Sequence, residues 1–341
     1  MLAAMSESLP AHVQLIQMGT AYWVSRVVYM AAELNLGDRL ADGPKTAAEL
    51  ADPTGTHERS LHRLMRTLAS LGVLAHAGNG RFALTPLGAS LKSDAPGSAR
   101  STLLAFGGEW MWDAFREFGH SIRTGDTAMA KAHGMGLFDF LGQHPDQAAL
   151  FSEAMVGFHG GEPPTVAEAF DFSHFDTIVD VGGATGNMLA HILTRHARPR
   201  GVLFDRPHVI TEAPALIAAR GLTARISIDT GDFFERVPEG GDAYILSHII
   251  HDWTEAQCLT ILGNVRRAMR KDGRLLLVEF VLPEVNEPHL GLLADMVMLS
   301  IPGGEERTAG EYRMLLAKAG FTVERVVPTA SPVSVVEARI S

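Results

Sequence analysis

The sequence predicts an α/β fold in which a mostly parallel sheet follows an all-helical N-terminal region. From residue 176 onward, short apolar stretches alternate with helical patterns, which is typical of a parallel sheet wrapped by helices. The last two apolar stretches are joined only by residues 329–332, which is too short for a crossover, so they form an antiparallel hairpin. Upstream of residue 95 the pattern is helical with one short hairpin. We therefore expect three regions, at 1–95, 96–170 and 171–341.

Each expected strand is a short apolar run bounded by turn residues. The strands are expected at residues 177–181, 201–204, 226–229, 243–247, 274–280, 322–328 and 333–339. Thr254 and Gln257 form a capping-box pattern that opens one helix, and Thr308 and Glu311 open the last helix in the same way. A parallel sheet that ends in a reversed strand is the arrangement of the common methyltransferase domain rather than of a dinucleotide dehydrogenase.

The composition favours a globular protein with a small partner. The chain has 341 residues, 46% of them apolar, a formal net charge of −10 and no run of like charges, which argues against binding to nucleic acid or anionic membranes. Cys258 is the single cysteine, so no intramolecular disulfide can form. The N-terminal residues lack a signal-peptide pattern, and no apolar stretch is long enough to span a bilayer. We expect a soluble cytoplasmic protein whose partner is small and either uncharged or cationic.

Residues 47–84 have the order helix, turn, helix and two-stranded wing. Leu61, Leu64, Met65 and Leu68 recur at helical spacing, and residues 78–80 supply the glycines and asparagine that a tight turn needs. This winged-helix arrangement has two interpretations. The positive side chains of the second helix, which fit DNA binding, are His57, Arg59, His62, Arg63 and Arg66. The acidic balance of the whole chain instead favours packing, for example against a second copy of this module.

Residues 95–170 are predicted to be helical and carry many large side chains. Such a set either lines a pocket or forms ordinary core. Its members are Trp110, Met111, Trp112, Phe115, Phe118, Phe138, Phe151, Met155 and Phe158.

The segment VDVGGATGN, residues 179–187, joins the first strand to a helix. Gly182, Gly183 and Gly186 allow a ligand to lie against the backbone, where the amides of the helix N-terminus carry a partial positive charge. A glycine triplet alone also fits an ordinary turn. The residues at the ends of the next two strands decide between a turn and a binding site.

Acidic residues end the second and third strands. Asp205 lies at the spacing expected of an acid that binds two ribose hydroxyls. Asp232 could accept a hydrogen bond from an adenine amine, and Phe233 could cover the ring. Either aspartate alone could be an exposed loop residue, but the successive strand ends together predict an adenosine site.

His251 comes after the fourth strand, on the side of the sheet where ligands bind in such folds. A histidine with a pKa near neutrality can remove the proton from a phenol or alcohol. Glu279 and Glu306 are expected on the same side, where two carboxylates could orient the imidazole and stabilise its charged form. The alternative is that both are surface acids, with Glu306 paired to Arg307; Glu305 is an adjacent competitor.

The segments VDVGGATGN, FDRPHV, GDFFE, IIHDWTEAQC, VEFVLP and PGGEERT together resemble the plant-type O-methyltransferase family and its bacterial relatives in natural-product biosynthesis. The resemblance covers nearly the whole chain, including the winged-helix start. It implies a class I methyltransferase domain that binds S-adenosylmethionine, preceded by a winged-helix dimerisation domain. It assigns cofactor contacts to Gly182, Asp205, Asp232 and Phe233.

The resemblance also implies that His251 is the base and that Glu279 and Glu306 flank it. Two positions depart from the family pattern. Ser247 stands where a lysine or arginine is common, so it can contact the cofactor only through its hydroxyl. Ile301 stands where the plant members tend to have a substrate-contacting asparagine, which disfavours a plant phenylpropanoid substrate.

The expected function is transfer of a methyl group from S-adenosylmethionine to a hydroxyl, expected to be phenolic, of a small natural-product-like molecule, with no nucleic-acid, membrane or metal partner. Other interpretations remain open: a relative repurposed for hydroxylation or pericyclic chemistry, methylation at nitrogen or carbon, and a DNA-binding regulator. Met296, Met298 and Leu299 predict an apolar, adaptable wall for the acceptor. The candidate pocket residues are Trp110, Met155, Phe158, His159, Asp252, Met298 and Ile301.

Overall fold

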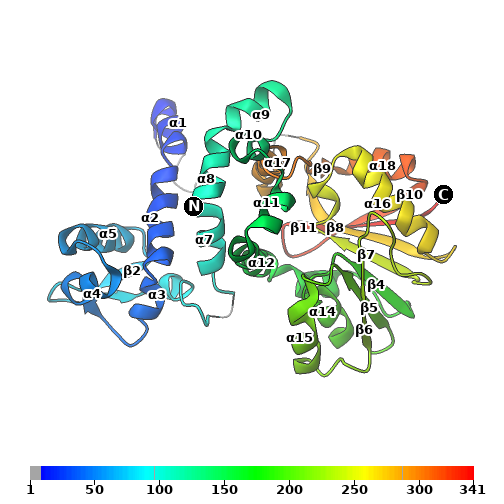
Figure 1. Ribbon diagram of the computed structural model, residues 1–341, viewed down its shortest axis with the longest axis horizontal. Coiled ribbons are helices and arrows are strands. Elements are labelled where there is room, and N and C mark those ends of the chain that lie inside the picture. The colour runs from blue at the N-terminus through cyan, green and yellow to red at the C-terminus, as the bar shows by residue number, and fades with distance from the viewer. Residues whose placement is uncertain (1–8, 96, 286) are drawn as a thin grey trace. The chain divides into compact units, whose positions relative to one another are not determined.

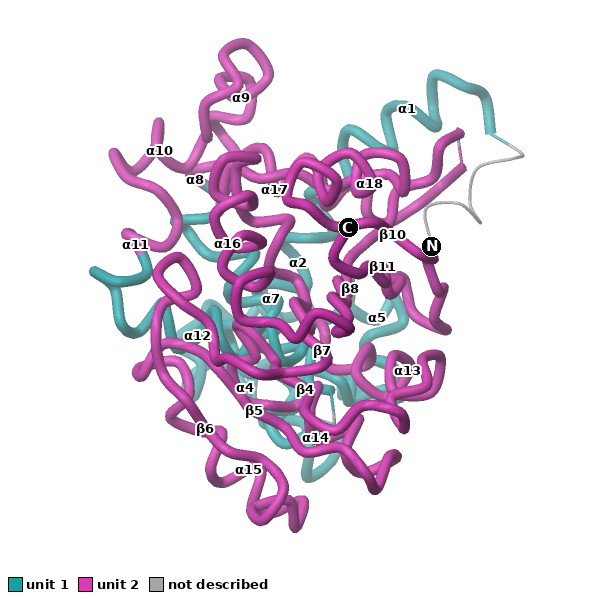
Figure 2. Tube along the Cα trace, turned by 90° about the vertical axis from the view of Figure 1, so that its right-hand side faces the viewer, with its two compact units in different colours: residues 1–112, 141–158 teal, residues 113–140, 159–341 magenta. Residues whose placement is uncertain are grey.

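The computed structural model describes residues 9–95, 97–285 and 287–341, which form two compact units (Figure 1). One unit contains the chain up to Trp112 together with Leu141–Phe158. The other contains Asp113–Phe140 and His159–Ser341. Figure 2 draws the first unit in teal and the second in magenta. Each unit has a hydrophobic core of its own.

The first unit is mainly helical. Its elements are α1 (Ala11–Gly19), α2 (Tyr22–Glu33), α3 (Leu36–Arg39), β1 (Lys45–Thr46), α4 (Ala47–Thr54), α5 (Glu58–Ser70), β2 (Leu74–His76), β3 (Arg81–Leu84), α6 (Pro86–Ala89) and α7 (Arg100–Gly107). The chain passes from one unit to the other within three further helices. These helices are α8 (Glu109–Arg116), α11 (Leu137–Gln143) and α12 (Pro145–His159).

The predicted winged-helix order is present in this unit. α5 buries Leu61, Met65 and Leu68, and the turn between β2 and β3 has positive φ angles at residues 78–80. The sheet of the wing has the order β1-β3-β2, so it contains the short strand β1 that the sequence pattern did not predict. A two-residue strand carries too little periodicity to be recognised.

The second unit is built on a sheet with the strand order β10-β11-β8-β7-β4-β5-β6, and β9 pairs with β8 outside this path. β11 is antiparallel to both of its neighbours, whereas the strands from β8 to β6 are parallel. The predicted reversed strand and the methyltransferase fold class are therefore confirmed. The strands are β4 (Thr177–Val181), β5 (Arg200–Asp205), β6 (Ile226–Thr230), β7 (Ala243–Ser247), β8 (Arg274–Leu282), β9 (Arg307–Thr308), β10 (Phe321–Pro328) and β11 (Val333–Ile340).

Helices cover both faces of this sheet. Alternate residues of each strand enter two separate cores, as the period of two requires; in β7, Ile245 enters one core and Tyr244 the other. The first core includes α13, α14 and α15, and the second includes α16 and α18. The helices of this unit are α9 (Phe118–Thr124), α10 (Ala128–His133), α13 (Glu162–Ala169), α14 (Asn187–Arg195), η2 (Ile210–Glu212), α15 (Ala213–Ala219), η3 (Ile250–Asp252), α16 (Glu255–Ala268), α17 (Leu290–Ser300) and α18 (Ala309–Lys318).

Both predicted capping boxes are formed, at the starts of α16 and α18. Across the described ranges, none of the helices has both the length and the apolar character needed to cross a membrane. Because β4, β5, β6, β7 and β8 run parallel, their carboxyl ends meet at one edge of the sheet. The residues just beyond these ends form the candidate site.

Candidate active site

The turn after β4 needs glycine at three positions for two different reasons. Gly182 and Gly186 have φ angles of 75° and 78°, in the left-handed region that side chains disfavour. A Cβ atom on Gly182 would also lie 2.4 Å from the side chain of Ile249. Gly183 is needed for close approach, because its Cβ would lie 2.5 Å from a carboxylate oxygen of Asp180. Side chains at these positions are therefore excluded, and the backbone of the turn packs closely against Asp180 and Ile249.

Two carboxylates lie behind this turn. Asp205, at the end of β5, accepts hydrogen bonds from the backbone amides of Ala184 (3.0 Å) and Arg206 (2.7 Å), and burial raises the pKa of its carboxyl group. The carboxylate of Asp180 is buried inside the sheet. Burial and the charge of Asp205 raise the pKa of Asp180 to about 7. The sequence analysis missed Asp180, although a single acid inside the apolar run of β4 was a visible signal.

The loop after β6 carries Asp232 and Phe233. Asp232 forms an ion pair with Arg206 (2.7 Å) and accepts a hydrogen bond from the amide of Phe234 (2.8 Å). The carbonyl group of Phe233 accepts a hydrogen bond from Asn264, so the backbone that carries its half-buried ring is fixed. The strand ends thus place a bare glycine backbone, three carboxylates and an aromatic ring along one edge. This donor set fits a nucleoside with a cationic group, as S-adenosylmethionine is.

His251 lies in the short helix η3 after β7 and is buried, with 7% of its side chain exposed. Its Nδ1 atom lies 2.7 Å from Glu306 Oε1 and 3.6 Å from Glu279 Oε2. Its Nε2 atom lies 3.7 Å from Asp252 Oδ1. Burial alone would lower the pKa of His251, but the charges of the three carboxylates outweigh it and raise the pKa to about 10.

Glu279 holds the backbone of the turn as well as facing the imidazole. Its carboxylate is fully buried, and Oε1 accepts hydrogen bonds from the amides of Ile249 (3.1 Å) and Ile250 (2.9 Å). Oε2 has no hydrogen-bond partner. Burial raises the pKa of Glu279 to about 8, against the opposing charge of His251. Glu279 therefore fixes the path of the chain that presents His251.

The segment after α17 approaches the same turn from the other side. The amide of Glu305 donates to the carbonyl oxygen of His251 (2.9 Å), and the amide of Glu306 donates to Asp295 (2.9 Å). Gly304 passes so close that a Cβ atom there would lie 1.9 Å from the carbonyl oxygen of His251. The glycines before Glu306 thus allow two backbones to meet.

The two interpretations of the glutamates are resolved by these contacts. Glu306 is buried against His251, whereas Arg307 forms its ion pair with the exposed Glu305 (2.7 Å). Cys258 donates from its thiol to the carbonyl oxygen of Ile250 (3.2 Å), and burial raises the pKa of the thiol to about 11. Cys258 therefore supports the turn and is not a reactive nucleophile.

The predicted pocket residues fall in both units. Trp110 and Ile301 are buried, and Met155 and Met298 are half-buried. Phe158 is exposed in part, with its ring 5.6 Å from that of Phe106. Their role in acceptor binding stays a prediction. The members in the first unit are Trp110, Met155 and Phe158, and those in the second are His159, Asp252, Met298 and Ile301.

We predict that Gly304→Ala destabilises the protein by about 1–3 kcal/mol, because the added methyl group forces apart the backbones of residues 251 and 304. Gly136→Ala is the matched control, since no atom lies within 4 Å of the position of its added Cβ. Thermal unfolding of both variants measures the difference. Equal melting temperatures would show that the two segments are not in contact.

Comparisons with known proteins identify the family. Residues 115–322 match the O-methyltransferase domain, and residues 16–94 match the O-methyltransferase dimerisation domain. The chain is 43% identical to the phenazine O-methyltransferase PhzM of Lysobacter antibioticus, covering 97% of each chain. It is 36% identical to the 8-amino-8-demethylriboflavin N,N-dimethyltransferase of Streptomyces davaonensis, covering 96% of this chain and 94% of that protein.

A solved structure connects the fold with the cofactor. The O-methyltransferase NcsB1 from neocarzinostatin biosynthesis, crystallised with S-adenosylmethionine and 2-hydroxy-5-methyl naphthoic acid, is 32% identical, with a TM-score of 0.80 and coverage of 93% of this chain and 96% of that one. The fold, the matched domains and these relatives agree. The chain belongs to the O-methyltransferase family and is an S-adenosylmethionine-dependent methyltransferase.

Proposed function

We propose that this enzyme methylates a phenolic hydroxyl of a small aromatic molecule and that His251 is the general base. The observation that carries the proposal is the buried imidazole at the carboxyl end of β7, held by Glu306 and surrounded by carboxylates. Relatives that act on phenazine and naphthoic acid compounds support an aromatic acceptor.

The cofactor supplies an activated methyl group on a positively charged sulfur. Residues proposed to hold it are Gly182, Gly183, Gly186, Asp205, Asp232, Phe233 and Ser247. Asp205 has the position of the acid that binds both ribose hydroxyls. Ser247 ends β7 and pairs with Val278, so it lies at the same sheet edge as the glycine turn.

His251 is proposed to remove the proton of the acceptor hydroxyl as the oxygen attacks. In the neutral ring, Nδ1 donates to Glu306, which leaves the lone pair of Nε2 to receive the proton. The surrounding carboxylates stabilise the imidazolium that results. Glu279 is proposed to act twice, through its charge and through the two amides that it holds. Alignment of the reactants supplies the larger share of the acceleration, up to about 7–11 kcal/mol in well-oriented systems.

Methylation at nitrogen is the second candidate, since an N,N-dimethyltransferase is among the relatives. A neutral amine attacks through its own lone pair and needs no base before the bond forms. A phenol has to lose its proton as it attacks. The buried histidine with its carboxylates therefore favours the oxygen acceptor.

We predict that His251→Ala lowers kcat by about 10²–10⁴-fold for a phenolic acceptor, because the variant loses general-base catalysis. The affinity for S-adenosylmethionine should change little. The assay measures S-adenosylhomocysteine with a panel of hydroxyphenazines, hydroxynaphthoates and the matching amines, and His76→Ala is the control at an exposed histidine. Full turnover by the variant would refute the base assignment. Unchanged turnover with amines alone would favour N-methylation, and a product formed without S-adenosylhomocysteine would indicate repurposed chemistry.

We predict that Asp205→Asn weakens S-adenosylmethionine binding by about 10–100-fold, since it replaces charge-assisted hydrogen bonds by neutral ones. Asp229→Asn, on β6 and paired with Arg236, is the matched control. Titration calorimetry measures both affinities. Equal affinities would remove Asp205 from the cofactor site.

We propose that the chain forms a homodimer through its N-terminal domain, which matches a dimerisation domain. α1 has no buried residue, although its sequence is largely apolar. The large apolar side chains left exposed along α1 and α2 are Leu15, Ile16, Met18, Tyr22, Trp23 and Val24. A contiguous exposed apolar set of this kind marks a protein interface. The dimerisation match also favours the packing interpretation of the winged helix over DNA binding.

We predict that Trp23→Glu shifts the dimer toward monomer, because a charge replaces an aromatic ring that is 61% exposed in the single chain. Arg59→Glu on α5 changes a charge of the same unit outside this apolar set and should leave the dimer intact. Light scattering coupled to gel filtration measures the mass. A wild-type monomer, or an unchanged mass for Trp23→Glu, would contradict this interface.

A further inference from the structure

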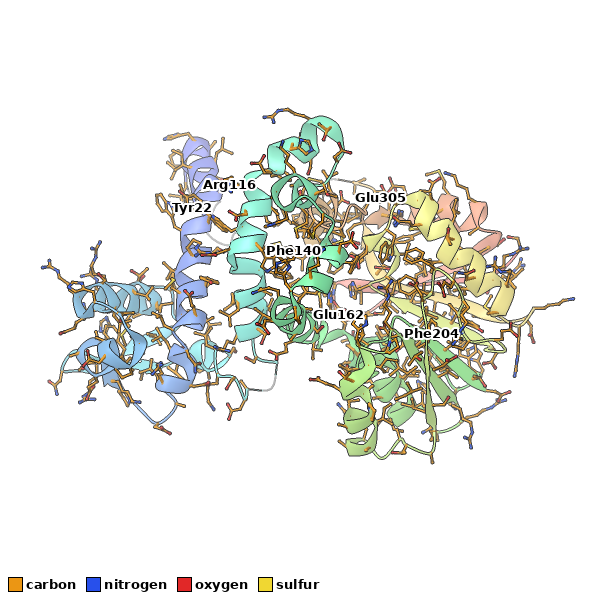
Figure 3. All side chains as sticks on the ribbon, viewed as in Figure 1. Tyr22, Arg116, Phe140, Glu162, Phe204 and Glu305 are labelled. Atoms are coloured by element: carbon orange, nitrogen blue, oxygen red, sulfur yellow. The ribbon has the colours of Figure 1, made fainter. Side chains whose placement is uncertain are left out.

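A second cluster of metal-ligating side chains lies beside the proposed active site, and the proposed chemistry does not use it. It joins His159, the last residue of α12, Glu162, the first residue of α13, and His248, which comes directly after β7. Figure 3 labels Glu162 at the start of its helix. His248 Nε2 lies 2.6 Å from Glu162 Oε2, and His159 Nδ1 lies 3.3 Å from the same carboxylate. The planes of the two imidazole rings are tilted by 36°, with centroids 3.8 Å apart.

The protonation states of this cluster suit metal ligation. Burial would raise the pKa of Glu162, but hydrogen bonds from His159 and His248 lower it to about 2, so the carboxylate is ionised. Burial and the charge of His159 lower the pKa of His248 to about 3, so this imidazole is neutral. Metal ligands have to be deprotonated carboxylates and neutral imidazoles. In the hydrogen bond to the ionised Glu162, His248 Nε2 carries the ring proton, so ligation through Nε2 requires that this proton moves to Nδ1.

The cluster contains a buried carboxylate whose partners are titratable histidines. Only 8% of the Glu162 side chain is exposed, and its ion-pair partners within the described ranges are the two histidines, with no lysine or arginine among them. A buried carboxylate without a permanent cation is costly. His248 Nδ1 is also buried without a hydrogen-bond partner. A divalent ion would neutralise this carboxylate.

The spacing of the ligand atoms is close to what one ion requires. The three candidate ligand atoms lie within 4.8 Å of one another. Two ligands on a tetrahedral zinc ion, at about 2.1 Å each, stand about 3.4 Å apart. The distance from His159 to Glu162 is close to this value, and the distance from His248 to Glu162 needs to lengthen by about 0.8 Å.

We propose that His159, Glu162 and His248 form a binding site for a transition-metal dication of the zinc class. Two imidazoles and one carboxylate are a ligand set that zinc takes in proteins. Magnesium and calcium require more oxygen ligands than this cluster offers. A second set of candidate ligands, His248 with His251 and Glu279, uses side chains that already bond within the proposed active site. The ion is therefore assigned to the first set.

The site is coupled to the proposed base by its position. The ring of His248 lies 5.2 Å from the ring of His251, and both side chains project from the connection between β7 and α16. A bound dication opposes the positive charge that develops on His251 when it accepts a proton. Zinc is therefore an inhibitor of methyl transfer, an effect that rests on the proposed function of His251.

The experiment uses the full chain without a polyhistidine tag, stripped with chelator and titrated with Zn²⁺ in competition with a chromophoric chelator. The expected result is one equivalent of zinc per chain, and no competition from Mg²⁺. Glu162→Gln and His248→Asn should each weaken zinc binding by at least about tenfold, since even residues that only orient metal ligands contribute that much. His76→Gln removes an exposed histidine outside the cluster and should bind zinc as the wild type does.

Folding and activity are measured separately from binding. Circular dichroism establishes that each variant is folded, and Co²⁺ absorption reports a four-coordinate site in the wild type only. Zinc should lower kcat in the wild type and have less effect in Glu162→Gln. No zinc uptake by the wild type, or equal affinity in the folded variants, would overturn the site. Stoichiometric binding with unchanged kcat would overturn only the coupling to His251.

Discussion

The two hydrogen bonds from the backbone to the buried carboxylate of Glu279 hold the geometry on which the proposed chemistry depends. Glu279 belongs to β8, where its register with β11 fixes its position, and it holds the amides of Ile249 and Ile250. The turn that carries His251 is thereby attached to the sheet itself. A rigid strand positions a side chain more precisely than a loop does. The arrangement explains why a carboxylate is tolerated inside the core of the sheet.

The carboxylates around His251 stabilise its protonated form, whereas the proposed base has to be neutral before it reacts. They raise its pKa, so they favour the imidazolium that proton transfer produces. A base, however, has to be neutral before it reacts. A cationic cofactor in the crevice disfavours the imidazolium and moves the balance toward the neutral ring. The carboxylates and the charge of a bound cofactor would therefore act in opposite directions on the pKa of the proposed base.

The succession of strands along the chain and the residues proposed to hold the cofactor at their carboxyl ends could be predicted from the sequence, because both depend on local patterns. All seven predicted strands are present, and the short connection after residue 328 indicated the reversed strand. His251, Glu279 and Glu306 could be placed on one side of the sheet for the same reason. The contact of both glutamates with His251 was one of two predicted alternatives, and the sequence could not decide between them. That Arg307 pairs with Glu305, and Glu306 with His251, depends on how the segment after α17 meets the turn.

Other features needed coordinates because they join distant parts of the chain. The sequence predicted no metal ligands, since Glu162 and His248 are separated by 86 residues and neither has a recognisable ligand spacing. Asp295 accepts a hydrogen bond from the amide of Glu306. It belongs to α17, which the sequence pattern predicted only as an apolar wall for the acceptor. Two further residues could have been singled out from the sequence. Asp180 is an acid inside an apolar strand, and Gly304 belongs to a pair of adjacent glycines. The reason for Gly304 is the close approach of its backbone to that of His251, which no local pattern contains.

The conformation of His248 links the turn to the metal-ligating cluster. Its φ angle is 52°, in the left-handed region, which costs a residue other than glycine about 1–3 kcal/mol. Glycine would make the same turn without that cost, so the backbone alone does not explain a histidine here. The amide of His248 donates to the carbonyl oxygen of Val278 (3.0 Å), so the backbone still pairs with β8 at this residue. The ring of His248 contacts Glu162, whereas His251, three residues later, contacts Glu306. The left-handed conformation thus allows one short connection to present two imidazoles, each bonded to its own buried carboxylate.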